Sequence, residues 1–180
     1  MNAIVRRAVA EDAPSLATVH IETWQAAYRG QLPAAYLDNL SHELAHRTEM
    51  WRERIATSKP DSHEIWVAEI DHRVEGFVAL GPARDEGGKR TGEVYAIYVH
   101  PRNWDQGIGQ QLFSRASDRL AARGYATAVL WVLESNARAR RFYEIAGWTA
   151  DGRAKTDRHP DGMEFRDVSY SMRLNRNNEE

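Results

Sequence analysis

The spacing of apolar residues changes repeatedly along the chain, and this predicts strands alternating with helices. Alternation or β-branched and aromatic runs predict strands at residues 4–9, 65–70, 73–80, 93–100, 126–133 and 168–174. The second and third of these are close enough to form a hairpin. Apolar residues at helical spacing predict four helices, from about Glu11 to Gly30, from Ser41 to about Ile55, from Gly109 to Gly124, and over 136–146.

This order of elements predicts an α/β fold, with a mixed sheet covered by helices on both faces. We expect one domain over residues 1–174 and a frayed tail at 175–180. The polar, glycine-rich segment 82–92 is expected to form a mobile loop.

Composition and charge narrow the classes of function. The net charge of −2 gives no general attraction to nucleic acid or to anionic membranes. The sequence has no cysteine, which excludes disulfides, thiolate zinc sites and a cysteine nucleophile. Neither a signal peptide nor an apolar run long enough to cross a membrane is evident, so we expect a soluble cytoplasmic protein.

The segment 93–112 is the strongest local indication of a ligand. A strand rich in β-branched and aromatic residues ends at Pro101, a turn containing Gly107 and Gly109 follows, and then an amphipathic helix begins. This arrangement directs several backbone N–H groups at one anion, and the helix dipole adds partial positive charge there. We therefore expect a phosphate group to bind at residues 104–109.

A second segment makes this indication more specific. Residues 130–148 carry a strand, Glu-x-Asn, x-Arg-Ala-x-x-Phe-Tyr-Glu and x-x-Gly-Trp, and residues 104–109 resemble a Gln/Arg-x-x-Gly-x-Gly/Ala loop. In both segments the chain resembles the GNAT superfamily of acetyl-CoA-dependent N-acetyltransferases. The resemblance implies a GNAT-like fold with a mostly antiparallel sheet whose two central strands splay apart around the cosubstrate. Trp104 departs from the motif, where Gln or Arg is expected.

The resemblance implies which residues hold acetyl-CoA, and no metal is expected. The pantetheine arm would pair with the exposed backbone of the central strand, and the diphosphate would lie on the glycine loop. Arg102 would contact phosphate or remain a solvated arginine, and Asn136 would cap its helix or bond a pantetheine amide. The full set is Ile97, Tyr98, Val99, Arg102, Trp104, Asp105, Gln106, Gly107, Ile108, Gly109, Gln110 and Asn136.

Two residues are candidates for catalysis by the same resemblance. Glu93 would take a proton from the amine, directly or through water, because an amine of pKa about 10.4 is mostly protonated at neutral pH. Tyr143 would donate to the leaving thiolate. The alternative, without a catalytic role, is that Glu93 is an exposed glutamate at the start of a strand and that Tyr143 is a tyrosine of the core. Without cysteine, we expect direct transfer in a ternary complex rather than a thioacyl enzyme.

The acceptor is the least defined part of the prediction. Trp24, Gln25 and Tyr28 lie on the first helix, which borders the acceptor site in GNAT folds, although aromatic residues at this spacing also suit a core. The loop 82–92 would help to close the site or remain a solvated loop. The acceptor would be a small-molecule or peptide amine, and the sequence leaves a homodimer open.

Three other readings compete with this one. His42, Glu43 and His46 match the His-Glu-x-x-His zinc signature with Glu64 as a distant third ligand, but the two histidines point away from the apolar face of Leu44, Trp51 and Ile55. The strand and glycine loop also imitate a dinucleotide-binding unit, but Leu112 stands where the third glycine belongs. Finally, a sensor could bind acyl-CoA with this fold and catalyse nothing.

Overall fold

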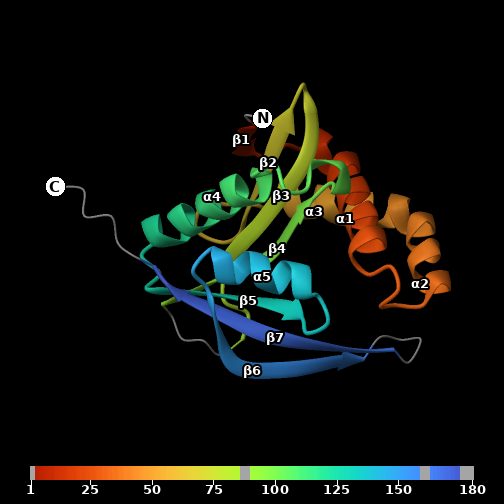
Figure 1. Cartoon of the computed structure of the whole chain (residues 1–180). Coiled ribbons are helices and arrows are strands. Elements are labelled where there is room, and N and C mark those ends of the chain that lie inside the picture. The colour runs from red at the N-terminus through yellow and green to blue at the C-terminus, as the bar shows by residue number, and fades with distance from the viewer. Residues whose placement is uncertain (1–2, 86–89, 159–162, 175–180) are drawn as a thin grey trace.

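The fold is built on a mixed sheet. The computed structural model describes residues 3–85, 90–158 and 163–174, and in these residues seven strands pair in the order β1-β2-β3-β4-β5-β7-β6. Every neighbouring pair is antiparallel except β4 and β5, which confirms the predicted fold class. The strands are β1 (Ile4–Arg7), β2 (Glu64–Ile70), β3 (Arg73–Pro82), β4 (Thr91–Val99), β5 (Thr127–Leu133), β6 (Thr149–Arg158) and β7 (Glu164–Arg173) (Figure 1).

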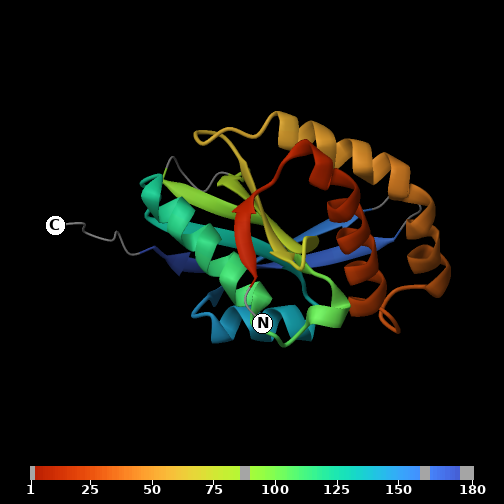
Figure 2. The ribbon, with the colours of Figure 1, turned by 90° about the horizontal axis from the view of Figure 1, so that it is seen from above.

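Helices cover both faces of this sheet (Figure 2). They are α1 (Ala13–Ala27), α2 (Ala34–Asn39), α3 (Leu44–Ala56), α4 (Ile108–Ala122) and α5 (Ala137–Ile145). Short 3-10 turns occupy Ala10–Asp12, Leu40–Glu43 and Pro101–Asn103. Helices α1 and α3 pack on one face and α4 and α5 on the other, so the central strands are buried on both sides. The apolar run in β3 follows from this, because Phe77 and Ala79 face α1 and α3 while Val78 and Leu80 face α4.

The structure corrects the expected element list in several places. Strand β6 was not predicted, because it is an edge strand whose ten residues are mostly polar and almost entirely exposed. Strand β7 begins at Glu164 rather than at 168, and the short helix α2 was missed. Ser41 does not cap α3, which begins at Leu44 after a 3-10 turn. Strands β3 and β4 extend into the predicted loop 82–92, and residues 86–89 of that loop and the predicted tail 175–180 lie outside the described residues.

One irregularity in β4 sets the position of the site. Along the β3–β4 ladder Leu80 faces Val94 and Ala79 faces Ala96, so Tyr95 is the extra residue of a β-bulge. The parallel pairing of β4 with β5 ends at the same point, at Val94 and Leu130. A bulge increases the local twist of its strand, and this accounts for the separation of β4 from β5 beyond Val94. The splay that the sequence resemblance implied is therefore present.

Candidate functional site

A cavity of about 940 Å³ lies where β4 and β5 separate. The second half of β4 and the end of β5 form two of its walls, and α1, α5, β6, β7 and the start of α4 complete the lining. Its lining includes most of the residues that the sequence predicted, namely Trp24, Tyr28, Ile97, Tyr98, Val99, Trp104, Asp105, Gly107, Ile108, Gly109, Gln110, Asn136 and Tyr143.

The exposed edge of β4 presents backbone groups to this cavity. The N–H of His100 donates to the carbonyl of Glu75, on the β3 side, at 2.8 Å. Since neighbouring residues of a strand direct their backbone groups to opposite edges, Ile97 and Val99 face the cavity and Tyr98 faces β3. An extended chain could therefore pair with Ile97 and Val99 as an added strand.

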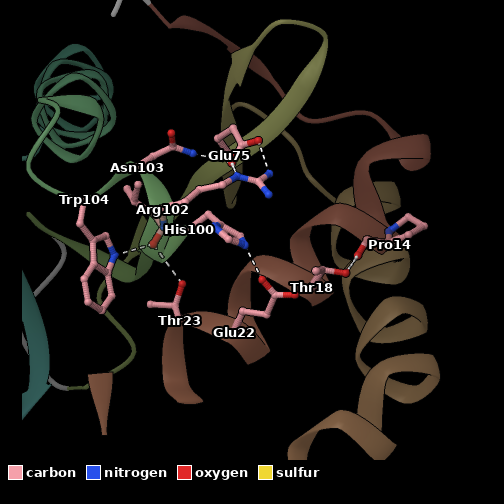
Figure 3. Close-up of polar contacts among 10 residues, drawn as sticks. Pro14, Thr18, Glu22, Thr23, Glu75, His100, Arg102, Asn103 and Trp104 are labelled. Carbon is pink, nitrogen blue, oxygen red and sulfur yellow. Dashed lines mark hydrogen bonds and ion pairs between the residues drawn. The ribbon is translucent and has the colours of Figure 1, made fainter. Parts of the chain in front are cut away.

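The carbonyl of Val99 already has two partners from the protein (Figure 3). The hydroxyl of Thr23 donates to it at 3.1 Å, and the indole N–H of Trp104 donates to it at 2.7 Å. Trp104, the departure from the family motif, thus ties the glycine loop to the end of β4. The N–H of Val99 and the backbone of Ile97 remain the groups on this edge that a ligand could use.

The start of α4 closes one end of the cavity. Gly107 precedes the helix with φ +80°, a left-handed conformation that strains any residue with a Cβ, and Asp105 also has a positive φ of 61°. The first N–H groups of this 15-residue helix have no carbonyl partner within it, and they combine with the helix dipole to favour an anion. Gly109 has a different role, because an added Cβ would press on the Phe142 ring of α5 at 3.4 Å.

Two arginines of α5 were missed by the sequence reasoning. Arg138 and Arg141 are three positions apart on one helical face, and both line the cavity. The guanidinium carbon of Arg138 lies 4.3 Å from the centre of the Trp104 ring, and its Nη2 donates to Asp105 at 2.9 Å. The spacing of these arginines behind Asn136 was visible in the sequence, but their direction depends on how α5 packs against α4.

Tyr143 belongs to α5, and its ring packs toward α4 and β7. It is buried to 7% exposure against Phe113, Phe142 and Tyr170, and it lines the cavity. Burial raises the pKa of its phenol well above the ordinary value, so the group keeps its proton at neutral pH. Within the described residues its hydroxyl has no hydrogen-bond partner, which leaves it free to donate.

Asn136 acts as the N-cap of α5. Its Oδ1 accepts from the N–H of Ala139 at 3.1 Å, and its Nδ2 donates to the hydroxyl of Tyr28 at 3.0 Å. Of the two roles that the sequence left open, the structure shows the cap. The bond to Tyr28 also joins α5 to α1 across the cavity. Burial raises the pKa of Tyr28, so it too remains a neutral phenol.

Glu93 lies beside the cavity but does not line it. Its carboxylate is 1% exposed and accepts the backbone N–H of Arg84 at 2.8 Å, the Nε of Arg84 at 3.1 Å, and its Nη2. Arg84, which does line the cavity, thus stands between Glu93 and the space where a substrate could bind. At the bulge, the hydroxyl of Tyr95 donates to the carbonyl of Pro82, and burial raises the pKa of Tyr95 to about 12.

Three other candidates are turned away from the cavity. The guanidinium of Arg102 is paired with the buried carboxylate of Glu75, to which the side chain of Asn103 also donates (Figure 3). Gln106 bonds the carbonyl of Arg102, and Gln25 bonds Leu37 and Ser41. None of these three lines the cavity.

The residues of the zinc signature do not converge. His42 and His46 are exposed, and Glu43 is paired with Arg47 in the i,i+4 arrangement. Glu64 is fully buried and paired with Arg119. The apolar face proposed for this helix needs one correction, because Trp51 and Ile55 are buried but Leu44 is 43% exposed.

Two further features, a metal-binding group of side chains and a helix able to span a membrane, are absent from the described residues. Among residues 3–85, 90–158 and 163–174, no group of three His, Asp or Glu side chains is placed to hold a metal ion. In the same residues, no helix combines the length and the apolar character that crossing a membrane requires.

Comparison with known proteins agrees with the geometry of the site. Residues 20–148 match the Acetyltransferase (GNAT) family. The chain is 31% identical to the uncharacterized N-acetyltransferase YuaI of Bacillus subtilis (strain 168) over 133 residues, which cover 73% of this chain and 72% of that protein. It is 28% identical to the probable N-acetyltransferase Rv2775 of Mycobacterium tuberculosis over 171 residues, which cover 95% and 94% of the two chains.

A solved structure shares the fold. The PaiA N-acetyltransferase of Thermoplasma acidophilum, crystallised in complex with coenzyme A, superposes with a TM-score of 0.74. The match covers 96% of this chain and 99% of that one at 19% sequence identity.

Proposed function

This chain belongs to the GNAT acetyltransferase family, and from that premise we propose that it transfers the acetyl group of acetyl-CoA to an amine by direct attack in a ternary complex. The observation that carries the proposal is the cavity between the separated strands β4 and β5, which ends at the amino terminus of α4. It offers a strand edge for an amide-containing arm and an anion site for a diphosphate, in the order in which acetyl-CoA presents them.

The residues of the cavity fit coenzyme A in two regions. Ile97 and Val99 would hold the pantetheine amides through their backbone groups. The N–H groups at the start of α4, preceded by Gly107, would hold the diphosphate, and Arg138 and Arg141 would add positive charge beside it. We assign no phosphate contact to the side chain of Arg102, because Glu75 occupies it.

Acetyl-CoA supplies an acetyl group activated as a thioester. The protein has to assist two proton transfers. One proton must leave the acceptor ammonium before its nitrogen can attack. The other must reach the departing sulfur, and we assign that donation to Tyr143, whose phenol stays protonated in the cavity. No cysteine is present to carry the acetyl group, which supports transfer without a thioacyl enzyme.

The role of Glu93 as the proton acceptor stays a prediction. Both of its carboxylate oxygens are engaged by Arg84, so it could act on an amine only through water or through Arg84. Residues Trp24 and Tyr28 border the same cavity and are proposed as part of the acceptor site. Gln25 is not, because its side chain is bonded between α2 and the 3-10 turn that follows it.

The test combines binding and turnover. A ligand that binds only the folded protein raises its unfolding temperature, so acetyl-CoA and CoA should raise it and NAD should not. Free thiol release is then followed with acetyl-CoA and a panel of peptide N-termini, lysine derivatives, polyamines, amino sugars and small amino acids. An intersecting initial-velocity pattern is expected, whereas parallel lines would contradict direct transfer. Tight binding of CoA without turnover of any amine would instead favour the acyl-CoA sensor.

A further inference from the structure

The outer strands β6 and β7 bring three charged side chains to the cavity. In the β6–β7 ladder Lys155 faces Asp167, and Asp157 faces Phe165, so all four residues share one face of the sheet. All four line the cavity, as does Trp24 of α1, whose ring lies 6.3 Å from that of Phe165. None of the residues of this wall belongs to the strand edge or the helix start that would hold coenzyme A.

Asp167 is the carboxylate of this wall that lies deeper in the protein. It is half-buried, whereas Asp157 is exposed at the rim. No hydrogen-bond donor in the described residues reaches its carboxylate. Lys155, the cross-strand neighbour, lies over the ring of Trp131 at 4.4 Å and forms no ion pair with Asp167 within the part of the chain that the structure describes. A half-buried carboxylate without a donor, open to the substrate cavity, is able to receive an ammonium group.

This carboxylate shares its cavity with three tyrosines of the proposed site. Asp167 lines the same cavity as Tyr28 and Tyr98. Burial is the main cause of the raised pKa of both phenols, and the negative charge of Asp167 adds a smaller contribution. Tyr143 lines this cavity too, and its pKa is raised by burial first and then by Tyr98 and Tyr28. Asp167 and the proposed proton donor therefore line one cavity, whose walls include α1, β4, α5 and β7.

The surroundings also favour a stronger base than an ordinary aspartate. Burial raises the pKa of Asp167, the positive charge of Lys155 lowers it, and the negative charge of Asp157 raises it again, with a net upward shift. The phenols of Tyr28 and Tyr98, which line the same cavity, stay neutral because burial raises their pKa. Glu93, by contrast, is closed off by Arg84.

We infer that Asp167, on the wall that it shares with Lys155 and Asp157, is the residue that binds the acceptor's ammonium group and takes its proton. The inference rests on the proposed acetyl transfer and names a catalytic residue for it. A carboxylate at this position also selects acceptors that arrive as cations, which favours aliphatic amines over weakly basic aromatic amines.

The proton and electron balance is complete without any further reactant. The ammonium gives one proton to Asp167, and the freed lone pair of the nitrogen forms a bond to the thioester carbonyl carbon. The C–S bond then breaks with its electron pair going to sulfur, which takes a proton from Tyr143. The nitrogen loses its second proton, which restores Tyr143. The products are the acetylated amine, the thiol of coenzyme A and one proton, which Asp167 releases to solvent.

The first experiment compares Asp167→Asn with the natural protein, using acetyl-CoA and the amine of the panel that the natural protein turns over fastest. We expect kcat to fall about 100- to 10,000-fold, with the affinity for CoA, measured by calorimetry, unchanged. Dithiodipyridine reports free thiol at acidic pH, so activity can be measured at pH values both above and below the pKa of Asp167. The natural protein should lose kcat/KM as pH falls through the pKa of Asp167, and this limb should be absent from Asp167→Asn.

The second experiment shifts the pH at which kcat/KM is lost on the acid side, instead of abolishing that loss. Asp157→Asn removes a like charge and should shift the acid limb to lower pH, while Lys155→Met removes an opposite charge and should shift it to higher pH. A residue with a purely structural role would not produce shifts of opposite sign.

The outcomes separate this inference from the proposed function. If Asp167→Asn keeps activity within about threefold, or if Glu93→Gln abolishes the limb and Asp167→Asn does not, the assignment to Asp167 is wrong while acetyl transfer stands. Loss of CoA binding in Asp167→Asn, or an acid limb that neither Asp157→Asn nor Lys155→Met moves, would also overturn the inference. A natural protein that releases no thiol with any amine would overturn both.

Discussion

The carboxylate of Glu93 is enclosed by a single residue, Arg84, which donates to it from both its backbone N–H and its guanidinium. The two partners differ greatly in exposure, with 1% of the glutamate side chain and 59% of the arginine side chain accessible to solvent. The pair lies at the start of β4 and, through Arg84, forms part of the cavity wall. Removing one partner is therefore not equivalent to removing the other.

We predict that Arg84→Ala destabilises the protein more than Glu93→Gln. The first change leaves a buried carboxylate without its counter-charge, at a cost of about 3 kcal/mol or more. The second leaves a largely solvated guanidinium and keeps an oxygen for the backbone N–H, at a cost of about 1 kcal/mol. Urea unfolding at pH 7 measures both free energies. A larger loss for Glu93→Gln would show that the pair does not exist as described.

Tyr143→Phe should lower kcat with little effect on stability. The hydroxyl has no protein partner in the described residues, so its removal breaks no bond in the folded state, but the leaving sulfur loses its donor. We expect kcat to fall about 100-fold with the KM for acetyl-CoA unchanged. The matched control is Tyr170→Phe, whose ring lies 6.1 Å away.

In that control the hydroxyl bonds Glu144 and Arg140 and does not reach the cavity. Its loss should cost stability and leave kcat intact. If both variants show the same profile of activity and stability, Tyr143 is a core tyrosine and another group protonates the sulfur.

Gly107→Ala should weaken CoA binding, and Gly124→Ala should not. Both glycines have a left-handed φ, +80° and +81°, and an added Cβ would meet nothing within 4 Å at either position. The conformational cost is therefore matched, at about 1–2 kcal/mol each. Gly124 follows the carboxyl end of α4, remote from the anion site, so only Gly107→Ala should change the affinity for CoA in calorimetry. Equal affinities in the two variants would contradict diphosphate binding at the start of α4.

The parts of the site that the sequence predicted are those that depend on local chain geometry. The strand, the glycine turn and the helix start at 93–112 follow from residues that are neighbours in sequence, and their arrangement was found as expected. The N-cap role of Asn136 is equally local. These features needed no knowledge of how distant elements pack.

The parts that were missed depend on long-range contacts. Strand β6 has no apolar alternation, because one of its faces is exposed and the other carries Lys155 and Asp157 to the cavity. The direction of Arg102, toward Glu75 on β3 and away from the cavity, could not be read from its position beside the glycine loop. The same holds for Asp167, whose place in the cavity depends on the sheet order β5-β7-β6.

We predict that His20 makes the free energy of unfolding depend on pH. Its ring stacks on that of Tyr98 with 4.7 Å between centroids and contacts the guanidinium of Arg47 at 3.2 Å. Burial, with the positive charges of Arg47 and Arg54, lowers the pKa of His20 to about 3. In the unfolded chain the pKa of a histidine is about 6.5.

As pH falls below about 6.5, the unfolded state therefore takes up a proton that the folded state refuses until about pH 3. The free energy of unfolding decreases over this range by up to about 1.4 kcal/mol per pH unit from this residue. His20→Phe keeps a ring against Tyr98 and does not titrate, so its stability should fall less than that of the natural protein between pH 6.5 and pH 5, by up to about 2 kcal/mol.

Urea unfolding at several pH values measures the difference, with His46→Gln, an exposed histidine of α3, as the control for loss of a histidine. Parallel pH dependences for the natural protein and His20→Phe would show that His20 is free to take a proton in the folded state. Because His20 stacks on Tyr98, whose backbone belongs to the strand that borders the cavity, protonation at low pH would then reach the site as well. In that case the natural protein should lose CoA affinity on acidification and His20→Phe should not.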